Sequence, residues 1–190
     1  IPSMITVGLT SAMSFCLNQI LLAFSTTATA VFGVWLKLQN FAFMPIYGLN
    51  NGTVPMISYN YGAGQMDRVR QTVSLALKAA LVLMIVLVLV FLQIPGQLLR
   101  MFSASDTMLS IGITALRITC LSLPFGAVTL ILSSSFQALG YSRYTLIINL
   151  GRQLFFIVPI AWLMSLTGQL SLVWTATVIA EALSMILSVF

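Results

Sequence analysis

Long apolar stretches separated by short polar connectors run through the whole sequence, and they constrain its fold more than any other feature. A helix needs about 20 apolar residues to cross the hydrocarbon core of a bilayer. Backbone groups in lipid must be satisfied within the spanning segment, so stretches of this length predict helices rather than strands. We therefore predict an all-α polytopic membrane protein with transmembrane helices at approximately 3–24, 28–50, 72–94, 108–135, 145–165 and 170–190.

The composition supports a membrane protein and argues against other classes. Hydrophobic residues make up 59% of the chain and charged residues only 6%, whereas a soluble domain is about 25% charged. The eight basic residues are scattered, so the net charge of +5 does not predict a nucleic-acid partner. The sequence has no histidine, no nucleophile–base pair and no cluster of metal ligands, and we predict neither an enzyme nor a cofactor.

The connectors differ in charge, which predicts the orientation. Arg68 and Arg70 follow the second predicted helix, and Arg143 precedes the fifth. Because basic residues favour the cytoplasmic side, we expect these two connectors to be cytoplasmic. The chain begins without Met and ends inside an apolar run, so we also expect a fragment of a longer protein.

The segment that leads out of the second predicted helix is rich in residues that interrupt helices. Pro45, Gly48 and Pro55 are expected to loosen or stop that helix. Gly62 and Gly64 then permit a tight turn before the third helix begins.

Two sequence patterns stand out in the connectors. The first is the connector Tyr-Asn-Tyr-Gly-Ala-Gly followed by two arginines, and the second is a Phe-Gln-Ala-x-Gly turn followed by Arg-Gln and then Pro in the next helix. Together they resemble the C-terminal half of multidrug and toxic compound extrusion (MATE) transporters. The resemblance covers essentially all 190 residues. The residues that carry it are Asn60, Gly62, Gly64 and Arg68 in the first pattern, and Gln137, Gly140, Arg152, Gln153 and Pro159 in the second.

The resemblance implies one six-helix lobe of a twelve-helix antiporter in the bacterial inner membrane. Such a protein exports organic, often cationic, compounds by alternating access, driven by a sodium or proton gradient. The implied partners are the lipid bilayer and either the missing N-terminal lobe or a second copy of this chain. Some relatives have carboxylates in the first and fourth helices of this lobe that form a cation site; both helices lack them here, so we do not transfer that sodium site.

Ionisable side chains at membrane depth are candidate functional residues because a charge there is costly. Glu181 lies near the middle of the sixth predicted helix; it either binds the coupling ion or a cationic substrate, or pairs with a buried base. Lys37 in the second helix either neutralises Glu181 or extends to a hydrated cavity. Asn149, Arg152 and Gln153 form a polar group in the fifth helix, which is a further cavity candidate.

Uncharged polar residues and prolines complete the candidates. Asn18, Gln19 and Asn40 are large enough to line an aqueous cavity, whereas smaller polar residues are more often packing contacts between helices. Pro124 is expected to bend the fourth helix and Pro159 the fifth, and such bends can act as hinges in transporters.

Two other functions fit parts of the sequence. A flippase for lipid-linked sugars, from the same broader superfamily, would share the helical arrangement but needs a more basic cavity. A structural membrane subunit without transport activity would have little need for deep charges such as Glu181 and Lys37.

Overall fold

Helices account for nearly all of residues 2–189, the part of the chain that the computed structural model describes, with side chains from residue 8 onward. Two of the long helical stretches are interrupted, one by a 3₁₀ turn and one by a π-helical segment. The elements are α1 (Pro2–Leu22), α2 (Thr26–Gly62), α3 (Met66–Gln93), α4 (Pro95–Arg100), α5 (Asp106–Thr119), the 3₁₀ turn Cys120–Ser122, α6 (Leu123–Ala138), α7 (Ser142–Leu150), the π-helical segment Gly151–Ile157, α8 (Val158–Ser165) and α9 (Leu170–Val189).

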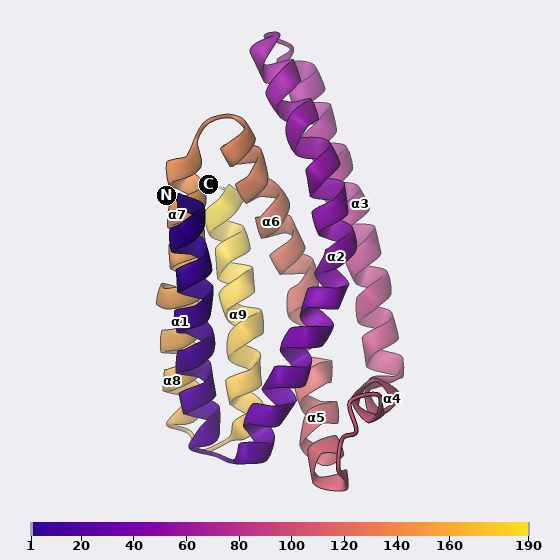
Figure 1. The fold of residues 1–190 in the computed structure, drawn as a ribbon, viewed down its shortest axis with the longest axis vertical. Coiled ribbons are helices and arrows are strands. Elements are labelled where there is room, and N and C mark those ends of the chain that lie inside the picture. Colours follow the sequence, from indigo (N-terminus) through magenta and orange to yellow (C-terminus); the bar gives the residue numbers. More distant parts are fainter. Residues whose placement is uncertain (1, 190) are drawn as a thin grey trace.

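The helices form an elongated bundle in which α2 and α3 make a long hairpin along one side (Figure 1). The helix α6 packs against α2, α3 and α9. On the opposite side, α1 lies beside α7 and α8, and α9 contacts the π-helical segment and α8. The hairpin therefore stands on one side of α6 and α9, and α1, α7 and α8 stand on the other.

The second helix is longer than predicted, and the expectation that it ends near residue 50 is wrong. Ser25 caps its start by accepting a hydrogen bond from the amide of Ala28 at 3.0 Å. The helix then continues through Pro45 and Pro55 to Gly62. A proline removes one backbone donor, but ending the helix inside a bilayer would leave several backbone groups without partners. Continuing the helix is therefore the less costly outcome.

Other boundaries differ for related reasons. The third helix begins at Met66 rather than 72, because our range followed the apolar residues and left out a polar first turn. The connector after it contains the short helix α4, with Pro95 in its first turn, a position that tolerates a missing amide. The fourth predicted helix is divided by the 3₁₀ turn Cys120–Ser122, shortly before Pro124, and the fifth is divided before Pro159 by the π-helical segment.

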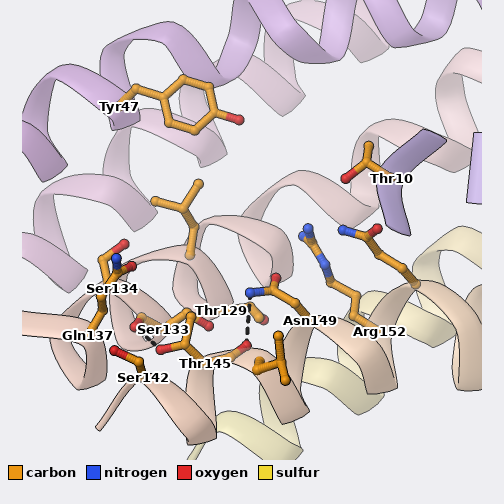
Figure 2. Close-up of a pocket in the computed structure, with 13 residues that line it drawn as sticks. Thr10, Tyr47, Thr129, Ser133, Ser134, Gln137, Ser142, Thr145, Asn149 and Arg152 are labelled. Carbon is orange, nitrogen blue, oxygen red and sulfur yellow. Dashed lines mark hydrogen bonds between the residues drawn. The ribbon is translucent and has the colours of Figure 1, made fainter. Parts of the chain in front are cut away.

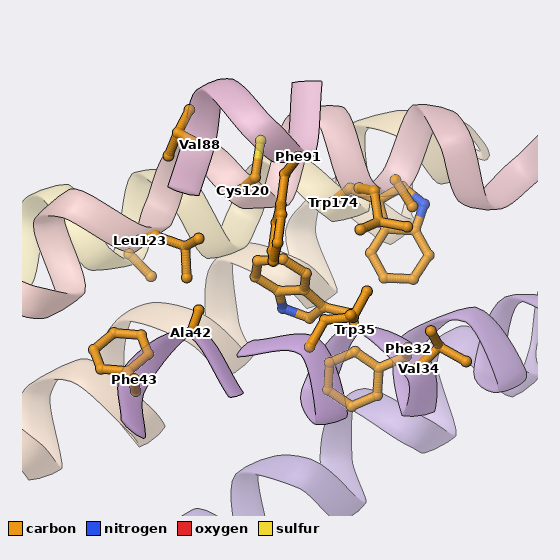
Figure 3. Packing of buried hydrophobic residues seen from close by; sticks show 14 of the residues in the cluster. Phe32, Val34, Trp35, Ala42, Phe43, Val88, Phe91, Cys120, Leu123 and Trp174 are labelled. Carbon is orange, nitrogen blue, oxygen red and sulfur yellow. The ribbon is translucent and has the colours of Figure 1, made fainter. Parts of the chain in front are cut away.

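The apolar core lies where α2, α3, α5, α6 and α9 meet (Figure 3). Trp35 of α2, Phe91 of α3 and Trp174 of α9 are large members of this buried cluster. Small side chains on α3, including Ala76 and Ala80, let neighbouring helices pack closely against it. Both cysteines are free; Cys120 lies in this core, whereas Cys16 is only half-buried.

Four helical segments of the described chain are long and apolar enough to cross a membrane. They match the third to sixth predicted spans. The first predicted span retains only the shorter apolar helix Gly8–Leu22 within the residues searched, and α2 does not meet the same test because polar residues interrupt it. The four segments are Met66–Gln93, Asp106–Ala138, Ser142–Ser165 and Leu170–Val189.

Two turns at the same end of the bundle use glycines with positive φ. Gly64 (φ 71°) follows α2, and Gly140 (φ 88°) follows α6. After α2, the amide of Gln65 donates to the carbonyl of Asn60 at 2.9 Å; after α6, the amide of Tyr141 donates to Phe136 at 2.8 Å. These are the hydrogen bonds of the Schellman motif, which satisfies the last carbonyls of a helix.

Candidate functional site

A cavity of about 280 Å³ lies between α1, α2, α6, the π-helical segment and α9, and the carboxylate of Glu181 forms part of its wall. We call it the Glu181 cavity. One face of α2 supplies side chains to it at spacings of three and four residues, which is the spacing of one helix face. These residues are Phe32, Trp35, Gln39, Phe43 and Tyr47.

A neighbouring cavity of about 430 Å³ is lined mainly by polar residues (Figure 2). We call it the Asn149 cavity. Ser133 and Ser134 of α6 lie on one wall, and Thr145 and Asn149 of α7 on another. Arg152 lines both this cavity and the Glu181 cavity, as do Thr10, Tyr47, Leu130 and Gln153. The two cavities are therefore adjacent, and Arg152 lies where they meet.

Arg152 and Glu181 form an ion pair between the π-helical segment and α9. The Nη1 of Arg152 donates to the Oε1 of Glu181 at 3.3 Å. The Arg152 side chain is 23% exposed and that of Glu181 only 7%. Of the two expectations for Glu181, pairing with a buried base is thus seen in the structure, and the base comes from the neighbouring part of the fifth predicted span.

The ion pair leaves polar atoms without partners. Among the described residues, four buried side-chain atoms have no hydrogen-bond partner. Every one of them belongs to a residue that lines one of the two cavities. A buried polar atom without a partner lowers the stability of the fold. The concentration of such atoms in the walls of the two cavities therefore indicates a functional site. The atoms are Ser133 Oγ, Arg152 Nε, Gln153 Oε1 and Glu181 Oε2.

The π-helical segment positions two of these residues. It spans Gly151–Ile157, and its adjacent residues Arg152 and Gln153 both line both cavities. Gly151 allows close approach to α9, because a Cβ at this position would lie 3.1 Å from the Cδ2 of Leu187. π-Helical turns within α-helices are often found at functional sites. The local irregularity is therefore located where the polar atoms gather.

Glu181 also rests on a glycine of α6. A Cβ at Gly126 would lie 3.4 Å from the Oε2 of Glu181 and 3.1 Å from the Cζ of Phe43. The absence of a side chain at Gly126 therefore leaves room for the carboxylate and for the aromatic ring beside it.

Some predicted site residues lie elsewhere. The Nζ of Lys37 is 5.8 Å from the centroid of the Phe102 ring, and the side chain is exposed, so the expectation that Lys37 neutralises Glu181 is wrong. The sequence could not show that Lys37 lies over Phe102, in the connector between α4 and α5, rather than beside α9. Asn18 is half-buried and Gln19 exposed, and neither lines the two cavities. Asn40 does line the Glu181 cavity.

Other cavity residues were missed in the sequence. Tyr47 lines both cavities, and its spacing of four from Phe43 was the available signal. Ser14 lines the Glu181 cavity although its small side chain suggested a packing role. Ser133 and Ser134 lie two turns before the Gly140 turn and gave no signal beyond their polarity.

The two Gly turns and the helix ends beside them form what we call the signature end, residues 58–68 and 134–144. Here the hydroxyl of Ser58 donates to the carbonyl of Ala138 at 3.0 Å. The Tyr61 phenol near Tyr141 raises the pKa of Tyr141. Asn60 bonds within its own helix, to the carbonyl of Met56 at 2.7 Å. Both basic connectors thus share one end of the bundle, as the predicted orientation requires.

The remaining signature residues are placed around this end. Gly62 and Arg68 are exposed. Pro55 and Gln137 line a further cavity between α2 and α6. Pro45 and Gly48 are exposed on α2, where the helix runs without interruption. Within residues 2–189, no three His, Cys, Asp or Glu side chains gather as metal ligands would.

Comparison with known proteins decides the family. The MatE family model matches residues 2–163. The chain belongs to the MatE family. This is a family of transporters, and the chain is accordingly an integral membrane protein, which its family and its bacterial relatives place in the bacterial plasma membrane.

Individual relatives agree with this assignment. The multidrug export protein MepA of Staphylococcus haemolyticus is 25% identical over 190 residues, which is 100% of this chain and 42% of the relative. An outward-facing multidrug resistance MATE family transporter of the MOP superfamily has a TM-score of 0.91, with 24% identity over 97% of this chain and 42% of that one. A MOP superfamily transporter from Pyrococcus furiosus has a TM-score of 0.93, with 23% identity over 98% of this chain and 43% of that one.

The aligned share of each relative shows which part of a transporter this chain corresponds to. The chain spans less than half the length of the relatives that it matches. Nearly all of this chain aligns with less than half of such a transporter, so the chain has the fold of one lobe of a MATE transporter.

Proposed function

We propose that this chain is one lobe of a secondary active multidrug exporter, which exchanges organic compounds for sodium or protons by alternating access. Its family and its similarity to multidrug export proteins support export as the activity. One observation supports the role of this lobe most directly. The Glu181 carboxylate is paired with Arg152 in the wall of a cavity inside a membrane-spanning bundle.

Glu181 is the group through which this lobe acts on a cation. A charge at this depth is costly, and Arg152 satisfies only one of the two carboxylate oxygens. The second oxygen remains available to the coupling ion or to a positively charged part of the substrate. The aromatic stripe on α2 supplies the apolar contact that an organic compound needs.

The second lobe of the same protein is the partner that completes the transport pathway. Gln19 of α1 and Asn40 and Tyr47 of α2 are exposed in the described chain, so their polar groups are open to contact with a second lobe. Alternating access in transporters built from repeats is largely a rocking of one lobe against the other. The coupling ion then biases the inward or outward state by its different affinities for the two.

The test is efflux of ethidium, a fluorescent organic cation, from cells that express the full-length parent under imposed sodium and proton gradients. Wild type is compared with Glu181→Gln, which removes the charge but keeps the shape of the side chain. The control is Asp106→Asn, the same chemical change in the exposed first turn of α5. We expect gradient-dependent efflux that Glu181→Gln loses and Asp106→Asn retains.

Two results would contradict the proposal. Full efflux by Glu181→Gln would move the coupling and binding group out of this lobe. No efflux of ethidium by well-expressed wild type under any gradient would contradict drug export and favour the lipid-linked-sugar flippase, which transport of a labelled lipid-linked sugar in the same membranes would then show.

A further inference from the structure

The ion pair between Arg152 and Glu181 contains only one of the two hydrogen bonds that these side chains can form. A guanidinium and a carboxylate can form two parallel hydrogen bonds, which is their strongest arrangement. Arg152 and Glu181 form one, at 3.3 Å, and both the Nε of Arg152 and the Oε2 of Glu181 are buried without partners. If this ion pair served only to join α9 to the π-helical segment, forming the second hydrogen bond would make it stronger.

The two partners differ in how freely they can move. Glu181 is held on α9 against Gly126 of α6, and its side chain is the more buried of the two. Arg152 reaches the carboxylate on a long side chain, is the more exposed, and borders the larger Asn149 cavity as well. The guanidinium therefore has space into which it can withdraw, whereas the carboxylate does not.

The surroundings of the carboxylate suit a flat aromatic cation. Phe43 lies next to Glu181 at Gly126, and Phe32 and Trp35 continue the same face of α2. Aromatic rings attract cations over their faces and stack against planar partners. Arginine, whose guanidinium is planar and cationic, has the same two properties as such a ligand.

We infer that Arg152 is a built-in competitor for the cation-binding position at Glu181. A planar aromatic cation binds the carboxylate only when the guanidinium has withdrawn toward the Asn149 cavity. The inference rests on the proposed function, since it specifies the substrate class and the regulation of that same carboxylate. It assigns to Arg152 a role in setting affinity rather than in binding substrate.

The consequence for affinity follows from mass action. When only a fraction of molecules is competent to bind, the apparent Kd is the intrinsic Kd divided by that fraction. If Arg152 occupies the carboxylate in about nine molecules of ten, its removal tightens binding about tenfold. Loss of a merely structural contact would not tighten binding.

The experiment measures ethidium binding to the purified full-length parent by fluorescence anisotropy. Arg152→Gln removes the charge, and we expect its Kd to be about tenfold lower than that of wild type. Arg152→Lys keeps a cation but loses the planar fork, so a smaller decrease is expected, and this variant carries the test if Arg152→Gln does not fold. Thermal melting confirms that each variant is folded.

A second measurement restores the competitor from solution. In Arg152→Ala, added methylguanidinium should occupy the vacated position and raise the Kd for ethidium, whereas wild type should show no such effect. Unchanged or weaker ethidium binding by folded Arg152→Gln and Arg152→Lys would overturn the inference, as would methylguanidinium that competes equally in wild type and Arg152→Ala. Failure of the proposed function is seen separately, as absence of gradient-driven export by wild type.

Discussion

The two sides of this bundle are built on different principles. Where α2, α3 and α6 meet, the helices are regular and most of the buried residues are apolar, among them Ala80, Met84 and Phe91. Where α1, the π-helical segment and α9 meet, a helix is irregular and two cavities remain. The four buried side-chain atoms without partners in the described residues all belong to the cavity walls.

The difference separates stability from function. The apolar side gains from dense packing, since interiors are packed as closely as organic crystals. The cavity side retains polar groups that a purely structural bundle would replace, because unpaired buried polar atoms are destabilising. Local departures from good packing and pairing are expected at functional sites. The predictions below follow this contrast from the largest expected effect to the smallest.

Trp174→Ala tests the apolar side. This side chain is 3% exposed in the core, and its loss should lower the free energy of unfolding by about 3–5 kcal/mol. Trp162 of α8 is 55% exposed, and Trp162→Ala is the control with a small expected effect. Melting of the full-length parent in detergent measures both. Equal melting temperatures for the two variants would contradict the assignment of the core.

Arg152→Leu tests whether the ion pair is coupled. Removing one partner leaves an uncompensated buried charge, which should cost about 3–5 kcal/mol of stability. The double variant Arg152→Leu/Glu181→Leu should recover most of that stability, because replacement of a buried pair by apolar residues is often neutral. A double-mutant cycle from melting data gives the coupling. Additive effects would show that the two side chains do not interact.

Gly126→Ala tests whether the Glu181 carboxylate packs against α6 at this glycine. The added Cβ would crowd the Cζ of Phe43 at 3.1 Å and contact the Oε2 of Glu181 at 3.4 Å, and such overpacking costs about 1–3 kcal/mol. Gly48→Ala is the control: no atom lies within 4 Å of its Cβ position, so it should stabilise α2 by up to about 1 kcal/mol. We expect weaker ethidium binding only in Gly126→Ala. Equal binding by both would place the carboxylate away from α6.

Gly64→Ala tests the signature end and should have the smallest effect. Its φ of 71° is strained for alanine, and the expected loss is about 1–2 kcal/mol. Gly62→Ala, in the last turn of α2 with open space at its Cβ position, is the matched control. Melting measures both, and ethidium binding should be unchanged. A loss of binding in Gly64→Ala would extend the functional site to this end.

Sequence reasoning located much of the site because charge is rare in this chain. Glu181 and Arg152 were notable as soon as the membrane spans were drawn, since a charge within lipid needs an explanation. Their pairing was not predictable, because it depends on how α9 and the π-helical segment are rotated about their axes. The same lack of rotational information made Lys37 a false partner for Glu181.

The predicted helix boundaries were wrong where a local sequence rule, such as a proline ending a helix, conflicts with the need to keep backbone hydrogen bonds inside the bilayer. The prolines of α2 suggested an end that the bilayer environment does not favour, and α2 continues to Gly62. No residue between Gly151 and Ile157 signals a π-helical turn; Pro159, which was expected to bend this span, lies two residues after the segment. The glycine turns at Gly64 and Gly140 were the most readable features, since their backbone conformation depends on the glycine itself.

The most direct test of the central claim, that the Glu181 carboxylate is the cation-binding group of this lobe, is ethidium binding to the purified full-length parent. Glu181→Gln is compared with Asp67→Asn and Asp106→Asn, which alter the other two carboxylates of the chain, both exposed in first turns of helices. The account predicts a Kd at least about tenfold higher for Glu181→Gln, which corresponds to about 1.4 kcal/mol, and wild-type values for both controls. A Kd for Glu181→Gln equal to that of wild type would contradict the account.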